Sequence, residues 1–205
     1  MMIATIEAIL AYALIGAHSL SIRTMSELFG VRIASSGMVI STGATGSVYE
    51  CKRKISVPTE KGDKTMWYLE RFIIAQEKFY EAALDEIVEG EKKSCWMWFV
   101  FPQITGLGYS KISKYFSIKS RGEAEAYLAH PVLGERLEEI SEALLELETN
   151  DPVEVFGEID AAKLQASMTL FWIISGKDVF ADVLVKYFGG YLCFKTVQIL
   201  RTMEV

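Results

Sequence analysis

The sequence predicts a mainly α-helical protein: a compact, single-domain bundle of several helices packed at orthogonal angles, with an irregular N-terminal extension. Two observations lead to this fold class. From residue 66 onward, apolar residues recur at steps of three and four, which is the spacing of one face of an amphipathic helix. In the same region, helix-capping residues and glycines alternate with short connections. No strand–helix alternation is visible, so a Rossmann-type sheet is not expected.

The composition is that of a folded protein of ordinary size. The chain has 205 residues, of which 51% are hydrophobic and 23% are charged, and this balance excludes intrinsic disorder. A chain of this length needs no disulfide or metal in order to fold. The formal net charge is 21 − 27 = −6, which disfavours binding to a nucleic-acid backbone. With only 2 histidines, a multi-histidine metal site is excluded, and we expect neither a metal nor a cofactor.

The charge is unevenly divided between two parts of the chain. Residues 1–65 hold 7 basic and 5 acidic residues, a net charge of +2, whereas residues 66–205 hold 14 basic and 22 acidic residues, a net charge of −8. The first part is rich in Gly, Ser, Thr and Val, which favours two short strands, at residues 38–41 and 47–51. We interpret residues 1–65 as an N-terminal extension, or as the result of a misassigned start codon, and residues 66–205 as the helical domain.

The cysteines and the N-terminal residues bear on location. Cys51, Cys95 and Cys193 lie too far apart for a CxxC site, and their odd number does not suggest a disulfide framework. We therefore expect a reduced, cytoplasmic setting. The apolar run at residues 3–17 is interrupted by Glu7, follows no basic residue and is too short to span a bilayer. Neither a secretory signal nor contact with a membrane is expected.

The first helix is predicted over residues 67–90, where the apolar residues follow the helical period and Gly90 supplies a C-terminal stop. After the aromatic segment described below, Ser120 and Glu123 form a capping-box pattern. In this pattern the hydroxyl accepts from a free backbone N–H group at the helix start, and the carboxylate reaches back. It predicts a short helix to about residue 128.

A second group of helices is predicted from proline and aspartate signals. His130–Pro131 breaks the chain, and Pro131 is suited to the first position of a helix that runs to about residue 147. The outer face of this helix is acidic. Asp151 starts a further short helix, which Gly157 ends.

The last three helices are predicted from the same kinds of signal. Asp160 is suited to cap a helix that is closed by Gly176, and Asp178 is suited to cap the next, which is closed by Gly189. Residues 196–203 are expected to form the final helix.

An unusual aromatic segment, SCWMWFVFPQITGLGYS, occupies residues 94–110. The period-two spacing of Trp96, Trp98 and Val100 predicts a short buried strand, which Pro102 would stop. The glycines that follow make a pliable loop, in which polar side chains stand beside a large apolar surface. Ligand pockets are commonly built in this way. The alternative is that the aromatic rings simply fill the core between the helices.

Four stretches of the chain, in this order and at this separation, carry a family resemblance: LERFIIAQEKFYEAALDEI, WMWFVFPQITGLGYS, EAEAYLAHPVLGERL and DAAKLQASMTLF. Over residues 67–202 the chain resembles the bacterial domain of unknown function family 1810, whose members are sometimes labelled calpastatin-like. The resemblance implies a mainly α-helical single domain and no established activity. A calpastatin-type inhibitor would be a disordered repeat chain, so that label has no support here.

The sequence departs from the family pattern in two places. The family usually has a histidine before the Trp-Met-Trp-Phe run, where this chain has Cys95. If that histidine were a general base, this chain would lack it or use a thiol. After the double glycine the family usually has a polar turn that contains aspartate, where this chain has the apolar residues 191–194.

The candidate functional residues are the polar and aromatic positions in and after the aromatic segment. His130 and Asp160 are the candidate catalytic bases, since an imidazole beside free N–H groups stays neutral and a carboxylate accepts a proton. The structural alternatives are a capping histidine and an ion pair between Asp160 and Lys163. The candidate ligand-binding residues are Trp96, Trp98, Gln103, Gly106, Gly108, Ser110, His130, Arg136 and Lys163.

These residues suggest a pocket for a small molecule. Aromatic rings can stack on a base and cations can meet a phosphate, so a nucleotide or an ADP-ribose-like ligand is the leading hypothesis, with hydrolysis as an associated activity. The alternative is a protein-interaction or self-association module without catalysis, in which the acidic helix face at residues 135–146 or the C-terminal aromatic residues meet a partner. We expect a monomer or a weak homodimer.

Overall fold

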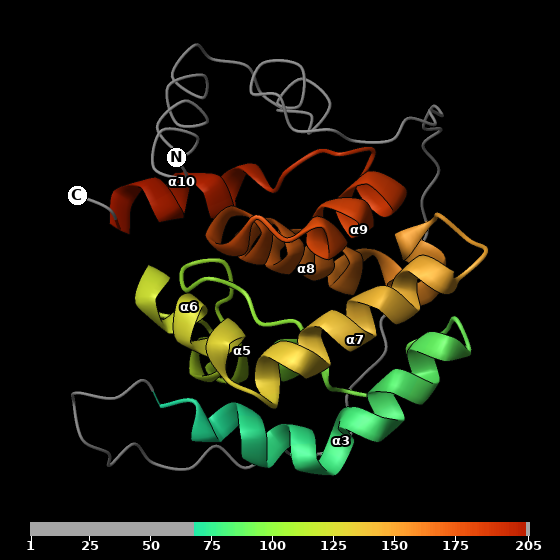
Figure 1. Cartoon of the computed structure of the whole chain (residues 1–205), viewed down its shortest axis with the longest axis horizontal. Helices are drawn as coiled ribbons and strands as arrows, with labels where there is room; N and C mark the ends of the chain where they lie inside the picture. Colours follow the sequence, from blue (N-terminus) through green and yellow to red (C-terminus); the bar gives the residue numbers. More distant parts are fainter. Residues whose placement is uncertain (1–67, 204–205) are drawn as a thin grey trace.

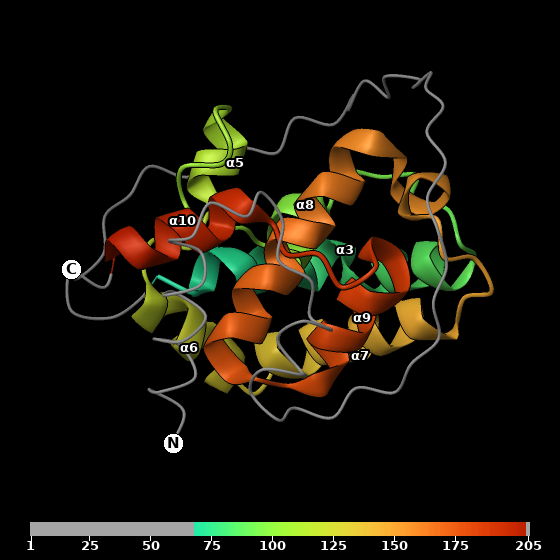
Figure 2. The same ribbon diagram turned by 90° about the horizontal axis from the view of Figure 1, so that it is seen from above.

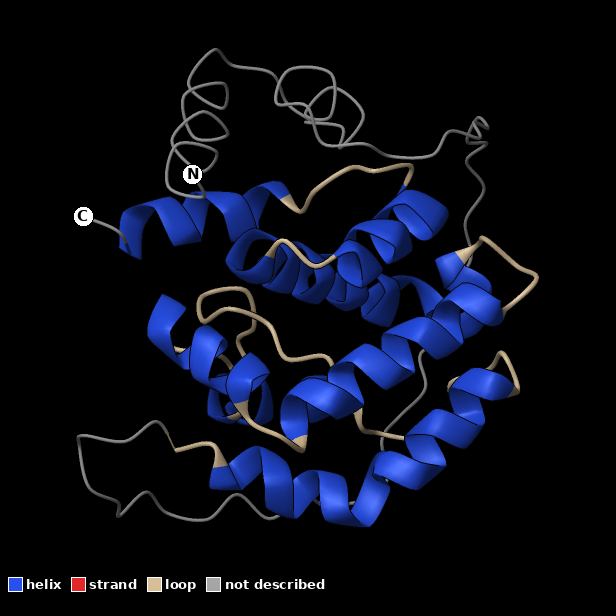
Figure 3. Cartoon of the chain, viewed as in Figure 1, coloured by secondary structure: helices blue, strands red, loops and turns tan. Residues whose placement is uncertain are grey.

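The computed structural model describes residues 68–203 of the chain, and within this range it is built from helices (Figure 1). The mainly α-helical prediction is confirmed. Figure 3 shows helices and loops but no strand in the described part of the chain, where the nearest approach to a sheet is an isolated parallel bridge between Ile104 and Ile118. The eight helices of this range are α3 (Glu70–Val88), α4 (Met97–Val100), α5 (Lys111–Tyr115), α6 (Arg121–Ala129), α7 (Leu133–Glu146), α8 (Pro152–Ser175), α9 (Asp178–Phe188) and α10 (Phe194–Met203).

The helices are stacked in tiers across the molecule. In the view of Figure 1, α3 lies at the bottom, α6 and α7 lie above it, and α8, α9 and α10 form the top. The two short strands expected at residues 38–41 and 47–51, and the N-terminal extension as a whole, fall outside the described residues. No helix of the described range is long and apolar enough to cross a membrane.

The capping signals locate most helix boundaries. The Ser120 hydroxyl accepts a hydrogen bond from the backbone N–H of Glu123, as the capping box predicts, at 3.1 Å. The carboxylate of Asp151 accepts from the backbone N–H of Val153 at 2.8 Å and starts α8. Gly176 and Gly189 end α8 and α9 in the left-handed conformation. These signals are local hydrogen bonds and backbone conformations, which is why they can be identified from sequence.

Two predictions about helix starts need correction, and one about a helix end is confirmed. Helix α7 begins at Leu133, two residues after Pro131, because the turn at residues 130–132 is completed before the helix starts. Gly157, with φ 71° and ψ 162°, divides α8 into two helical pieces, so the predicted end of the short helix that Asp151 starts is confirmed. Asp160 lies in the first turn of the second piece, but it does not cap this piece, because its carboxylate binds lysines instead of backbone N–H groups.

The aromatic segment forms a short helix, α4, rather than the predicted strand. Trp96 accepts hydrogen bonds at its backbone oxygen from the N–H groups of Phe99 and Val100, both at 3.2 Å. Every residue from 96 to 101 is buried except Trp98, which is half-buried. A segment that is enclosed on almost all sides needs no alternation of polar and apolar residues, so period-two spacing does not distinguish a strand from a helix here.

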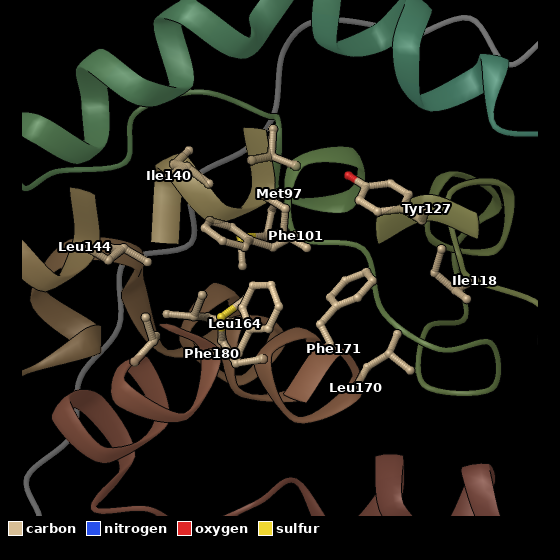
Figure 4. Packing of buried hydrophobic residues seen from close by; sticks show 14 of the residues in the cluster. Met97, Phe101, Ile118, Tyr127, Ile140, Leu144, Leu164, Leu170, Phe171 and Phe180 are labelled. Carbon is tan, nitrogen blue, oxygen red and sulfur yellow. The ribbon is translucent and has the colours of Figure 1, made fainter. Parts of the chain in front are cut away.

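The rings of this segment fill the centre of the core. Figure 4 shows Met97 and Phe101 facing the side chains that α8 and α9 contribute to the same cluster. Phe171 of α8 lies between Tyr127, at a ring-centroid distance of 5.4 Å, and Phe180, at 6.0 Å. The aromatic content of the sequence is therefore used mainly for packing, which was the alternative interpretation of the segment.

A buried ion pair joins the first helix to the middle of the molecule. The Arg71 guanidinium of α3 meets the Glu123 carboxylate of α6 at 2.6 Å, and the two side chains are only 4% and 2% exposed. The guanidinium also donates to the backbone oxygens of Tyr115 and Ser117, at 2.9 and 3.1 Å. The second oxygen of Glu123 accepts from the backbone N–H of Lys119 at 2.5 Å. Arg71 thus fixes α3, α5 and α6 relative to one another.

The cysteines differ from the expectation of an entirely reduced set. Cys193 is free and half-buried, whereas Cys95 is disulfide-bonded. The cysteine count therefore no longer argues for a reducing compartment.

Candidate functional site

One open pocket lies where the aromatic segment, α8 and the start of α10 meet. Its volume is about 380 Å³, within the lower part of the range for small-molecule sites. Figure 2 shows α10 beside α8, which runs through the middle of the view. The residues that line the pocket come from α4, the loop after it, α5, α8 and the segment before α10: Trp98, Gln103, Leu107, Gly108, Tyr109, Ser110, Ser113, Ala162, Lys163, Ala166 and Cys193.

Backbone contacts hold the pocket loop in place. Gln103 accepts at its backbone oxygen from the N–H of Ile118, and Thr105 donates to the oxygen of Ile118, both at 2.8 Å. Gly108 approaches α5 so closely that a Cβ atom at this position would lie 2.5 Å from the Ser113 side chain. Since real Cβ atoms do not come so near, only glycine fits there without a shift of α5. The loop is therefore a fixed wall of the pocket.

A three-residue charge network stands behind the pocket. The Asp160 carboxylate binds the Lys163 ammonium at 2.6 Å through one oxygen and the Lys92 ammonium at 2.7 Å through the other. The Lys163 nitrogen also lies 4.9 Å from the ring centroid of Trp98, a cation–π contact. Two cations share one carboxylate, so the network carries a formal charge of 2 − 1 = +1. Its pocket-facing member is Lys163.

The protonation of Asp160 follows from this network. Burial by itself raises the pKa of Asp160, but the charges and hydrogen bonds of Lys92 and Lys163 lower it by more, so its pKa lies below the usual value of an aspartate. At neutral pH the group is a carboxylate whose oxygens are both occupied by ammonium groups. It is a weak base, and the geometry argues against the role of proton acceptor that the sequence suggested.

Neutralising Asp160 should weaken the fold in a pH-dependent way. A group whose pKa is lowered on folding stabilises the native state above its unfolded pKa, about 3.9, and loses that contribution as the pH falls through the folded pKa. We expect Asp160→Asn to lower the free energy of unfolding by about 1–3 kcal/mol at pH 7, because two ammonium groups lose their charged partner. Urea unfolding from pH 7 to pH 2 tests this. The difference between wild type and variant should shrink below about pH 4, and a difference that stays constant over this range would contradict the assignment.

A second carboxylate, Glu86 of α3, organises the chain that leads into the aromatic segment. It accepts from the backbone N–H groups of Lys93 and Ser94, at 2.8 and 3.0 Å, and from the indole N–H of Trp96 at 2.7 Å. Burial raises the pKa of Glu86, but hydrogen bonds from Ser94, Lys93 and Trp96 outweigh it, so the pKa is lowered. Glu86 thereby fixes the segment from which Lys92 reaches Asp160.

The structure brings together five of the nine predicted ligand-binding residues. These five line the pocket: Trp98, Gln103, Gly108, Ser110 and Lys163. Ser110 also caps α5, since its hydroxyl accepts from the backbone N–H of Ser113 at 3.1 Å. Gly106 lies in the same loop but faces α10, where a Cβ atom would lie 3.2 Å from Ile199.

The other predicted residues lie elsewhere. Trp96 is fully buried in the core. The His130 ring sits in the turn between α6 and α7, where Nδ1 accepts from the backbone N–H groups of Val132 and Leu133, at 3.2 and 3.4 Å. The Arg136 guanidinium stacks 4.7 Å above the ring of Tyr80 in the α3–α7 interface. None of these three lines the pocket, and His130 has the structural capping role that was the alternative interpretation.

Several pocket residues could not be identified from the sequence. The spacing of Ser110 and Ser113 could have indicated a capped helix turn, and the Tyr109 side chain, which is 86% exposed, follows the glycine loop directly. Cys193 carried no signal at all, because the segment before α10 reaches the pocket only through the packing of α10 against α8. The pocket is formed by the packing of several segments and not by one sequence motif.

The fold and the pocket define a class: a small helical domain with an aromatic-lined, lysine-bearing pocket beside its central helix. The chain belongs to the family described as "Protein of unknown function (DUF1810)", whose model matches residues 66–200. This confirms the resemblance that the sequence showed. None of the curated proteins matches the chain.

A solved structure shows the same fold. The crystal structure of the conserved hypothetical protein Rv1873 from Mycobacterium tuberculosis is 40% identical to this chain, with a TM-score of 0.65. The match covers 66% of this chain and 97% of that one. That protein is described as hypothetical, so a function for this chain has to be argued from its own pocket.

Proposed function

We propose that the pocket binds a small organic anion that carries a planar ring, and that a nucleotide is the ligand class it suits best. The observation that carries the proposal is the position of Lys163, whose ammonium is held over the Trp98 ring by Asp160 at the wall of the pocket. A cation and an aromatic surface are thus presented together. Nucleotides combine a phosphate, which a lysine ammonium binds, with a base, which packs on aromatic side chains.

The charge around the pocket supports an anion. The network of Lys92, Asp160 and Lys163 leaves one positive charge, and the lining residues include no aspartate or glutamate. A cationic ligand would meet only repulsion from Lys163. Gln103, Ser110 and Ser113 add polar groups that can donate hydrogen bonds to phosphate or ribose oxygens.

The pocket volume favours one nucleotide unit. About 380 Å³ is near the lower limit for small-molecule sites, so a ligand of ADP-ribose size would extend past the rim. We therefore place a nucleoside monophosphate ahead of ADP-ribose as the ligand that the pocket encloses.

Binding without turnover is the activity we propose. Of the two candidate bases, Asp160 is engaged by two lysines and His130 caps a turn, and neither lines the pocket. The described lining residues contain no imidazole or carboxylate to move a proton. We therefore favour a ligand-binding domain over a hydrolase.

The alternative of an interaction module on the acidic face of α7 has less support. Part of that face is occupied within the molecule, since Glu138 pairs with Lys177 and Glu139 accepts from the Tyr80 hydroxyl at 2.6 Å. The remaining exposed glutamates are an ordinary solvated helix surface.

Isothermal titration calorimetry with adenosine and uridine 5′-monophosphates tests the proposal. We expect the wild type to bind them and Lys163→Ala to raise the dissociation constant at least about 10-fold, because a charge-assisted contact is lost. Lys78→Ala is the matched control, since Lys78 is an exposed lysine on α3 with no pocket contact.

Further ligands separate the contributions of ring and charge. Inorganic phosphate and adenosine should each bind more weakly than adenosine monophosphate, because each offers only one of the two groups, and ADP-ribose tests the size argument. Equal affinities of phosphate and the monophosphates would contradict a nucleotide site. No binding by any of these ligands, or an equal effect of Lys163→Ala and Lys78→Ala, would overturn the proposal.

A further inference from the structure

Three aromatic residues in or next to the pocket lining have a lysine nearby, one of them in space and the other two in sequence. Trp98 and Lys163 make the cation–π contact described above. At the start of α5, the pocket-lining and highly exposed Tyr109 is followed by the exposed Lys111. The third pair begins α10 (Phe194–Met203), directly after the pocket-lining Cys193.

This third pair consists of Phe194 and Lys195, both exposed, with 42% of Phe194 accessible. Tyr109 lines the pocket and Phe194 directly follows the pocket-lining Cys193, so two exposed rings occur in or next to one lining. A ring and a cation are thus in contact between α4 and α8, and they occur as sequence neighbours at the starts of α5 and α10.

The charges around the pocket contrast with those of the rest of the domain. Residues 68–203 hold 14 basic and 21 acidic residues, a net charge of −7. Within this acidic domain, residues 103–119 carry three lysines and no acidic residue, and residues 189–203 carry one lysine and one arginine and no acidic residue. Among the described residues, no carboxylate forms an ion pair with Lys111, Lys114 or Lys195. The pocket rim therefore attracts anions locally.

From these observations we infer that the pocket and its rim bind a short single-stranded oligonucleotide of about two or three nucleotides, with one nucleotide in the pocket and its neighbours on Tyr109 and Phe194. The inference rests on the proposed function and extends it from a nucleotide to an oligonucleotide. A single strand presents a base and a phosphate in every unit, which suits a surface that offers both exposed rings and unpaired lysines. An acidic peptide would use the lysines but not the rings.

The domain's net charge limits the length and form of the ligand. Duplex DNA carries one negative charge for about every 1.7 Å of its axis, and a long polyanion would reach the acidic faces of the domain. A short single strand can stay on the basic rim. The sequence-level argument against nucleic acid rested on total charge, and it applies to duplexes more than to this local surface.

The test compares uridine monophosphate with the trinucleotide pUpUpU by calorimetry on the full chain. We expect the trinucleotide to bind at least about 10-fold more tightly, because two further bases stack on exposed rings. Phe194→Ala and Lys195→Ala should remove most of this gain while leaving the affinity for uridine monophosphate unchanged, since neither residue lines the pocket. Lys78→Ala should change neither affinity.

Salt dependence gives an independent readout. If three lysines contact phosphates, the logarithm of the association constant should fall with a slope of about −2 against the logarithm of the salt concentration, which is roughly 20-fold between 50 and 200 mM. A slope near zero would overturn the inference. So would a hexaglutamate peptide or a short DNA duplex that binds as tightly as the trinucleotide, because the first would indicate a peptide surface and the second a duplex surface.

The two proposals can fail separately. If uridine monophosphate binds but the trinucleotide binds no more tightly, the oligonucleotide inference is wrong and the nucleotide pocket stands. If neither ligand binds, the proposed function itself is wrong.

Discussion

Replacing Glu123 by alanine should lower the free energy of unfolding by about 3–5 kcal/mol, because it leaves the Arg71 guanidinium buried without its charged partner. The pair is almost completely enclosed, with exposed fractions of 4% and 2%, and arginine cannot escape the cost by losing its proton. The same change removes the acceptor for the backbone N–H of Lys119. Chemical denaturation followed by circular dichroism gives the measurement.

Two controls separate the buried charge from the loss of the side chain alone. Glu125→Ala removes the partner of Arg121 in an exposed pair on the same helix, and it should cost under about 1 kcal/mol. A double variant, Arg71→Leu with Glu123→Leu, should lose less than Glu123→Ala, because no unpaired charge remains inside. Equal losses for Glu125→Ala and Glu123→Ala would contradict the role of this ion pair.

Alanine substitution of the two tryptophans of the aromatic segment should affect different properties: stability for Trp96 and nucleotide affinity for Trp98. Trp96→Ala should destabilise the fold by about 3–5 kcal/mol, because it opens a cavity in the core and removes the indole N–H that Glu86 accepts at 2.7 Å. Trp98 is half-buried and lines the pocket, so Trp98→Ala should cost less stability and should abolish most of the nucleotide affinity. Chemical denaturation gives the free energy of unfolding of each variant, and calorimetry gives its dissociation constant for the nucleotide.

Comparing the two alanine variants separates loss of core packing from loss of ligand contact. Trp96→Phe keeps a ring in the core and should recover much of the stability that Trp96→Ala loses. If Trp98→Ala retained full nucleotide affinity, the pocket would not be the binding site. If it destabilised the fold as much as Trp96→Ala, Trp98 would be a core residue as well.

The helices were predictable because the signals that define them are local. Ser120, Asp151, Gly176 and Gly189 each act through a hydrogen bond or a backbone conformation within one turn, and all four do in the structure what their positions suggest. The strand expected at residues 96–100 failed because burial on all sides removes the pattern on which such a prediction depends.

The site was only partly predictable because its residues come from segments that are distant in the sequence. Trp98, Gln103 and Gly108 belong to one contiguous segment, so identifying the segment was enough to find them. His130 and Arg136 looked equally suitable by residue type, yet α6 and α7 carry them to other contacts. Spatial neighbours contributed by distant segments depend on the packing of whole helices, which no local pattern encodes.

Chemical-shift mapping by NMR with adenosine monophosphate tests the central claim most directly, because it locates the ligand residue by residue. The claim predicts shifts at the Trp98 indole and at the backbone amides of Gly108, Ser110 and Cys193, which line one pocket. It predicts no shifts in the turn around His130. Shifts that centred on that turn or on the α3–α7 interface around Arg136, or an unchanged spectrum at saturating ligand, would contradict it.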